Sequence, residues 1–188
     1  MSTTGHHDSH TPEDIRQLWQ TPRWFFDYWN RHYHFAADIA ASDINHLCDN
    51  YITEEQNAFD YDFSHLVGEY VYCNPPYRDI NPWIDLFCKN ADEHGVGTVA
   101  LLPADVSTSW FKAASTTADE IIFITGGRLS FVRADTQQPI GGNTKGSVVL
   151  IYNPSKRYND GEAVNTSVSF MDRNNIKAIM EGYYGQNA

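Results

Sequence analysis

One stretch in the middle of the chain constrains the fold more than any other. Residues 70–73 and 97–103 are apolar runs that predict two strands, and residues 81–94 between them predict a helix. Pro82 suits the first turn of that helix, and Gly95 suits its end. A strand, a helix and a strand in this order form a βαβ unit, which pairs its strands in parallel. The sequence therefore predicts an α/β fold with a mixed, mostly parallel sheet.

The motif Asn74-Pro75-Pro76-Tyr77 directly follows the first of these strands. In open α/β sheets, ligands bind beyond the carboxyl ends of the strands. A residue before proline is held extended, so the Asn74 side-chain oxygen and the Pro75 carbonyl form a fixed pair of acceptors beside the Tyr77 ring. Such a group suits a planar ring with an exocyclic amine. A strand that ends in prolines, with a core tyrosine, explains the four residues equally well.

Other short pieces occur in a fixed order around this motif. They are Thr21-Pro22, Asp38-Ile39-Ala40-Ala41, Pro82-Trp83, Leu101-Leu102-Pro103 and Gly127-Arg128-Leu129. Together with the motif, they resemble the phage-type DNA adenine-N6 methyltransferases, the Dam-like family, from about residue 21 to residue 153. The resemblance implies a Rossmann-like methyltransferase fold with helices on both faces of the sheet, S-adenosylmethionine as the methyl donor, and adenine in double-stranded DNA as the acceptor. It also implies that Asn74, Pro75, Pro76 and Tyr77 are catalytic.

We expect the cofactor to bind at the end of the first predicted strand, residues 35–41. The resemblance assigns Asp38 and Ala40 to the cofactor, because small residues after a strand let a nucleotide approach the backbone. The usual Gly-x-Gly is absent, and Asp38 alone fits a turn or helix cap equally well. Thr21 and Pro22 are expected nearby. Asp62 is a candidate for the cofactor's adenine, and a solvated acid is the alternative reading.

The net charge of −11 is unusual for an enzyme that binds DNA, since phosphate contacts normally come from Lys and Arg. Residues 1–67 carry −8 and residues 68–188 carry −3, so the later part should face the duplex. The candidate contacts, around a long loop expected near the acceptor base, are Arg78, Arg128, Arg133 and Lys145. We expect weak, salt-sensitive DNA binding.

The length of 188 residues suits one domain, residues 11–188, after a disordered tail at residues 1–10. Residues 157–188 are expected to be peripheral, with a helix at residues 172–181. Three cysteines without a CxxC pair argue against a disulfide framework and a metal site. No apolar run is long enough for a membrane span. We expect a phage- or prophage-encoded protein of the bacterial cytoplasm, with no membrane and no obligatory protein partner.

The remaining elements follow from periodicity and from helix-start signals. Helices are predicted at residues 11–19, 22–33 and 44–51, and a polar loop at residues 105–111 is expected to lead into a further helix that ends at about residue 115. Strands are predicted at residues 50–53, 120–125, 129–132 and 147–152, and Leu66 and Val67 are expected in the core. Two classes of function stay open. One is methyl transfer to adenine N6 or to a related amine, namely cytosine N4, RNA adenine or a glutamine amide. The other is a non-catalytic nucleic-acid or cofactor binder.

Overall fold

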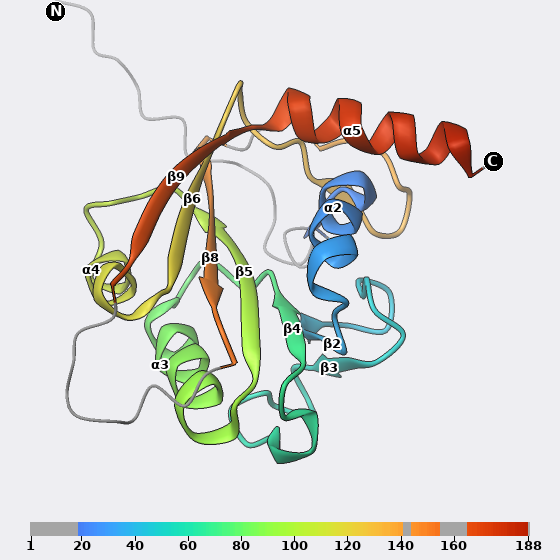
Figure 1. Ribbon diagram of the computed structural model, residues 1–188. Coiled ribbons are helices and arrows are strands. Elements are labelled where there is room, and N and C mark those ends of the chain that lie inside the picture. Colours follow the sequence, from blue (N-terminus) through green and yellow to red (C-terminus); the bar gives the residue numbers. More distant parts are fainter. Residues whose placement is uncertain (1–18, 141–143, 155–164, 188) are drawn as a thin grey trace, which may run out of the picture.

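The computed structural model describes residues 19–140, 144–154 and 165–187 (Figure 1). The predicted tail at residues 1–10 and most of the helix predicted at residues 11–19 lie outside these ranges. Trp19, at the end of that predicted helix, instead belongs to the short strand β1 (Trp19–Gln20).

A seven-stranded sheet forms the centre of the molecule, in the order β3-β2-β4-β5-β8-β6-β9. Strand β8 runs antiparallel to both of its neighbours, and all other neighbouring strands are parallel. The strands are β2 (Ala37–Ala41), β3 (Tyr51–Thr53), β4 (Tyr70–Cys73), β5 (Gly97–Pro103), β6 (Glu120–Thr125), β8 (Ser147–Tyr152) and β9 (Ser167–Asp172). The mixed, mostly parallel sheet is confirmed.

Helices cover both faces of the sheet (Figure 1). The helices α2 (Arg23–Tyr33) and α5 (Arg173–Gln186) lie on one face, and α3 (Asn81–Lys89) and α4 (Ser109–Thr117) lie on the other. Alternate residues of β5 divide between the two cores: Val99 packs on the α2 side and Ala100 on the α3 side. This alternation follows from the two-residue period of a strand.

The βαβ unit forms as predicted. Residues 90–94 continue α3 as one π-helical turn, and Gly95 ends it in a left-handed conformation with φ of 63°. Glycine tolerates this conformation without the steric cost that a Cβ would impose. The predicted strands β2 to β6 and β8 are present, as are the predicted helices α2, α4 and α5.

Four predictions about local structure were wrong. Residues 44–50 form turns, not a helix, and Val67 is 65% exposed. Only β7 (Val132–Arg133) forms near residues 129–132, and it pairs with β1 outside the main sheet. Strand β9 was missed because it is an edge strand with a weak core pattern: Phe170 is 72% exposed. It lies within residues 157–188, and pairs with β6 along its length.

Three side-chain contacts explain why residues 44–50 do not form a helix. The Asp38 carboxylate accepts a hydrogen bond from the N–H of Leu47. The Gln20 side chain donates to the carbonyl of His46, and the Arg23 side chain donates to the carbonyl of Leu47. A helix would have used these groups internally. Among the described residues, no helix has the length and apolar character that a membrane span requires.

Candidate functional site

The order of the strands creates a switch point between β2 and β4. The chain leaves β2 for β3 on one side and reaches β4 on the other side. Residues Asp38 and Tyr72 are register partners, so the carboxyl ends of β2 and β4 lie next to each other. Ligands of open α/β sheets bind in the crevice at such a point. A broad, open groove lies there, and its lining includes Ala40, Asn74, Pro75, Pro76, Tyr77 and Arg78.

The Asn-Pro-Pro-Tyr motif forms one wall of the groove, directly after β4. Pro75 is buried, Pro76 is exposed, and the Tyr77 side chain is 39% exposed. The Tyr77 hydroxyl donates a hydrogen bond of 3.0 Å to Asn74 Oδ1. This bond orients the Asn74 amide, and the second lone pair of the carbonyl oxygen remains available for another donor. Sequence reasoning assigned only the ring of Tyr77 a role, so the hydroxyl contact is an addition.

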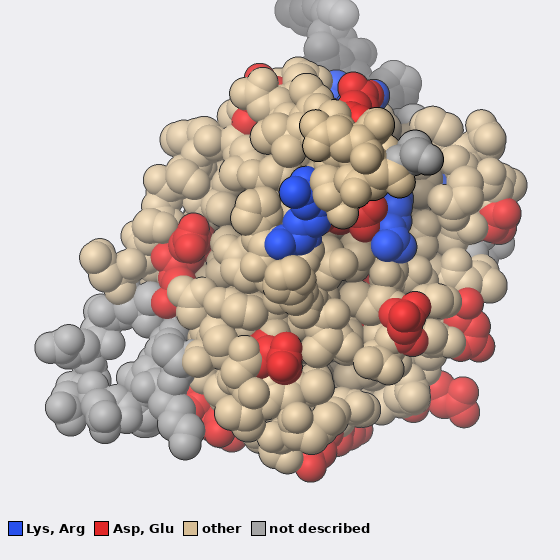
Figure 2. Space-filling model, turned by 45° about the vertical axis from the view of Figure 1, so that its right-hand side comes forward, with Lys and Arg blue, Asp and Glu red and all other residues tan. Residues whose placement is uncertain are grey.

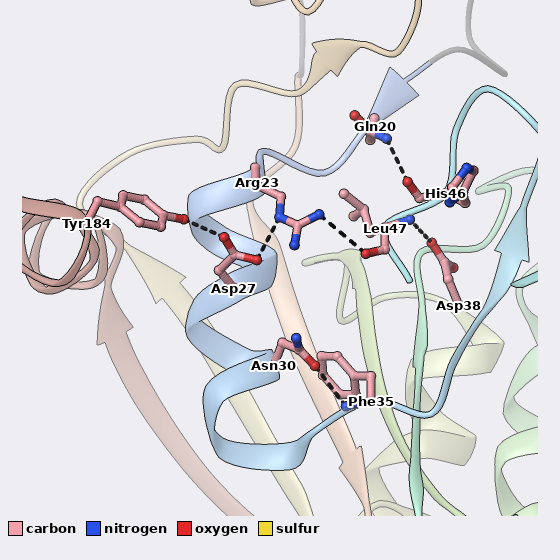
Figure 3. A network of polar contacts seen from close by, with 9 residues as sticks. All are labelled: Gln20, Arg23, Asp27, Asn30, Phe35, Asp38, His46, Leu47 and Tyr184. Atoms are coloured by element: carbon pink, nitrogen blue, oxygen red, sulfur yellow. Dashed lines mark hydrogen bonds and ion pairs between the residues drawn. The ribbon is translucent and has the colours of Figure 1, made fainter. Parts of the chain in front are cut away.

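Asp38 lies behind the groove and not in its lining. Its carboxylate, 4% exposed, accepts from the N–H of Ala40 at 3.4 Å and from that of Leu47 at 3.2 Å. Burial raises the pKa of Asp38 to about 6, although both N–H groups favour the charged form. Asp38 therefore holds the β2–β3 loop, residues 42–50, through Leu47 (Figure 3). Ala40 lies at the groove surface.

Thr21 and Pro22 also lie outside the groove lining. Thr21 is 1% exposed, and its hydroxyl lies 2.7 Å from the hydroxyl of Tyr72 in β4. Pro22 occupies the N-cap position of α2, and its carbonyl accepts from the N–H groups of Phe25 and Phe26. These contacts fasten the start of α2 to the strand that carries the Asn-Pro-Pro-Tyr motif.

Asp62 is exposed and does not line the groove. Its carboxylate accepts from the N–H of Ser64 at 2.9 Å, at the start of a 3₁₀ turn (Ser64–Leu66), and hydrogen bonds from Ser64 lower the pKa of Asp62. Glu54 and Glu55, directly after β3, line the groove instead. Sequence reasoning missed them, although an acid beyond the strand next to the first one is a recognised signal for ribose hydroxyls.

The four predicted DNA contacts divide into two pairs. Arg78 and Lys145 line the groove, and Arg128 and Arg133 do not. Lys145 Nζ forms a salt bridge of 2.6 Å with Asp105, which lowers the pKa of Asp105 to about 2. Arg133 pairs with Asp135 at 2.6 Å.

The turn around Arg128 depends on a residue that sequence reasoning missed. The Arg173 guanidinium donates to the carbonyls of Gly126, at 3.0 Å, and Arg128. Of the four predicted DNA contacts, Lys145 and Arg133 have acidic partners. Figure 2 shows few Lys and Arg side chains on the face toward the viewer, with Asp and Glu scattered around them.

The fold and the groove define an α/β protein with an open groove at the switch point of its sheet, the place where proteins of this class bind their ligands. A family model described as DNA N-6-adenine-methyltransferase (Dam) matches residues 8–181. The chain belongs to this family. It is similar to the DNA N-6-adenine-methyltransferase of Haemophilus phage HP1, with 32% identity over 152 residues that cover 80% of this chain and 86% of that protein.

A second relative is the DNA N-6-adenine-methyltransferase of Escherichia phage T1. It is 35% identical over 176 residues, which cover 84% of this chain and 70% of that protein. No solved structure matches the chain significantly.

Proposed function

We propose that this protein transfers a methyl group from S-adenosylmethionine to the N6 amine of adenine in double-stranded DNA, on a Rossmann-like methyltransferase fold. The observation that carries the proposal is the position of Asn74-Pro75-Pro76-Tyr77 at the switch point, in the wall of the groove. Membership of the adenine-specific family supports adenine over cytosine N4, RNA adenine or a glutamine amide.

The acceptor base is held by Asn74, Pro75 and Tyr77. Asn74 Oδ1 and the Pro75 carbonyl accept the two N–H bonds of the amine, which directs the nitrogen lone pair away from the ring. The base leaves the duplex to reach them and stacks on the Tyr77 ring, which is partly exposed for this contact. Pro76 keeps Pro75 extended. Asn74 and Pro75 would hold the nitrogen in place for methyl transfer, and the proton that the nitrogen loses would pass to the solvent in the open groove.

The cofactor fits the side of the groove at the end of β2. When bound, S-adenosylmethionine supplies a methyl group on a positively charged sulfur. The small residues Ala40, Ala41 and Ser42 line the groove and allow close approach to the backbone. Glu54 is positioned for the ribose hydroxyls. Asp38 acts indirectly, because its carboxylate holds the loop.

The remaining predicted residues act around the centre of the groove. Thr21 and Pro22 support the cofactor side through the start of α2, and Asp62 stays a candidate for the cofactor's adenine. Arg78 and Lys145 meet phosphates at the groove, and Arg128 and Arg133 act as outer contacts. Because the substrate is DNA, we place the enzyme in the cytoplasm of a bacterial host.

Labelled S-adenosylmethionine with unmodified DNA, followed by nucleoside analysis, tests the proposal. We expect the label in N6-methyladenine. Asn74→Ala should lower the single-turnover rate by about 10²–10³, as expected for the loss of one preorganised polar contact, while affinity for S-adenosylhomocysteine stays unchanged. Asn175→Ala, on the exposed surface of α5, is the matched control. Label in cytosine, label only in RNA or protein, or an Asn74→Ala rate equal to wild type would overturn the proposal.

A further inference from the structure

A small hairpin at the edge of the groove connects to β1. In this rim hairpin, residues 131–140, the N–H of Ile140 donates to the Phe131 carbonyl at 2.7 Å, and the N–H of Arg133 donates to the Gln138 carbonyl at 3.0 Å. Its strand β7 pairs with β1, and the Phe131 ring stacks on Trp19 with centroids 6.0 Å apart. Phe131 and Trp19 both line the groove. The rim hairpin therefore borders the groove.

Gln20 of β1 joins the rim hairpin to the β2–β3 loop. Its side chain is buried, with 8% exposure. Gln20 Nε2 donates to the His46 carbonyl at 3.3 Å, and Gln20 Oε1 accepts from Gln137 Nε2 at 3.2 Å. The next residue in the loop, Leu47, donates its N–H to Asp38 (Figure 3). The buried amide of Gln20 thus contacts both the rim hairpin and the β2–β3 loop.

The orientation of this amide is fixed by its partners. The His46 carbonyl can only accept, so the nitrogen of Gln20 must face the loop and its oxygen must face the rim hairpin. Gln137 must then donate, and its Nε2 donates also to the Ala134 carbonyl at 2.9 Å. Because the oxygen and nitrogen of Gln20 share one rigid plane, a rotation that breaks one bond also breaks the other.

The backbone of Gln137 adds a second observation. Its φ of 56° lies in the left-handed region, which is uncommon for a residue with a side chain. Its N–H donates to the Arg133 carbonyl at 2.7 Å, which closes the turn. The hairpin thus holds a strained residue in the position from which its amide reaches Gln20.

We propose that Gln20 is a positioning residue that couples DNA binding at the rim hairpin to cofactor binding at the β2–β3 loop. The inference rests on the proposed function. DNA that orders the hairpin fixes Gln137, which fixes the Gln20 amide and, through His46, the loop. The two arrangements of the amide, bonded to both partners or to neither, are the states that each ligand biases. Linkage requires the effect to be reciprocal.

The coupling is measurable with S-adenosylhomocysteine, which binds without turnover. Its Kd is determined by calorimetry for the full-length protein, alone and with a saturating unmodified DNA fragment that the wild type methylates. The ratio of the two values is the coupling factor. We expect a wild-type factor above one, and a factor lower by about two- to tenfold in Gln20→Ala, the range set by the loss of one or two hydrogen bonds.

Three further variants distinguish coupling from simple loss of structure. Gln20→Glu keeps the shape but removes the donor to His46, and should lower the factor. Gln137→Gly removes the partner amide while relieving the left-handed strain, so it should lower the factor without lowering the melting temperature. Gln138→Ala is the matched control, because Gln138 is an exposed glutamine in the same hairpin, and the wild-type factor is expected.

A wild-type factor of one, or an unchanged factor in both Gln20→Glu and Gln137→Gly, refutes the coupling. A wild-type protein that methylates adenine but shows no coupling refutes this inference alone. A wild-type protein that transfers no methyl group to DNA refutes the proposed function first.

Discussion

Replacing Asp38 should reveal the cost of burying its charge. The ordinary pKa of 3.8 rises to about 6 in the folded protein because burial disfavours the carboxylate. Between these two values, the folded chain binds more protons than the unfolded chain at this position. The contribution of Asp38 to the free energy of unfolding is therefore fully present below pH 3.8 and is lost as the pH rises through 6.

The shift sets the size of the effect. A pKa rise of this extent corresponds to about 3 kcal/mol in total, of which about 2 kcal/mol falls between pH 4.5 and pH 8. Asp38→Asn abolishes this titration. Because an amide has one acceptor oxygen, the variant also leaves the N–H of Ala40 or Leu47 without its acceptor, a loss of about 1–3 kcal/mol that does not vary with pH.

Urea unfolding followed by tryptophan fluorescence at a series of pH values separates the two effects. The stability of the wild type minus that of Asp38→Asn should decrease by about 2 kcal/mol from pH 4.5 to pH 8. Asp85→Asn, at an exposed position of α3, controls for the removal of one acid. A difference that stays constant, or that increases with pH, would show that Asp38 is not held in a desolvated site.

Two further predictions concern the groove. Tyr77→Phe keeps the stacking ring and loses only the bond to Asn74, so its rate should fall by at most about tenfold, whereas Tyr77→Ala also loses stacking, which is worth about 1–3 kcal/mol per base. An equal loss of rate in Tyr77→Phe and Tyr77→Ala, measured in single-turnover assays, would argue against stacking. Lys145→Ala should make the log–log salt dependence of DNA binding shallower by about 0.9, and Asp105→Asn, which removes the acidic partner of Lys145, should tighten DNA binding. An unchanged slope in fluorescence anisotropy titrations would place Lys145 away from the phosphates.

The sequence alone was sufficient to predict the central βαβ unit of the fold. The strands on either side of α3, the position of Asn74 at the end of β4, and the stop at Gly95 all follow from patterns within a few residues. Such patterns are reliable because the period of apolar residues and the backbone limits of proline and glycine act locally. The ordered motifs likewise indicated the family before any geometry was available.

Other features depended on partners far apart in the sequence. The prediction for residues 44–51 failed because the side chains of Gln20, Arg23 and Asp38 take backbone groups that a helix needs. Strand β9 was missed because its pairing with β6, and not its own composition, makes it a strand.

The same limit applies to the site. The sequence placed Asp38 near the cofactor, but only the tertiary structure shows that its carboxylate is buried and holds a loop. Arg78 and Lys145 reach the groove, and Arg128 does not, because the order of the strands decides which loops meet at the switch point. Local patterns determine which segments become strands and helices. The tertiary structure alone determines which distant polar groups become neighbours, because that depends on how the strands are ordered and on which buried groups must find partners.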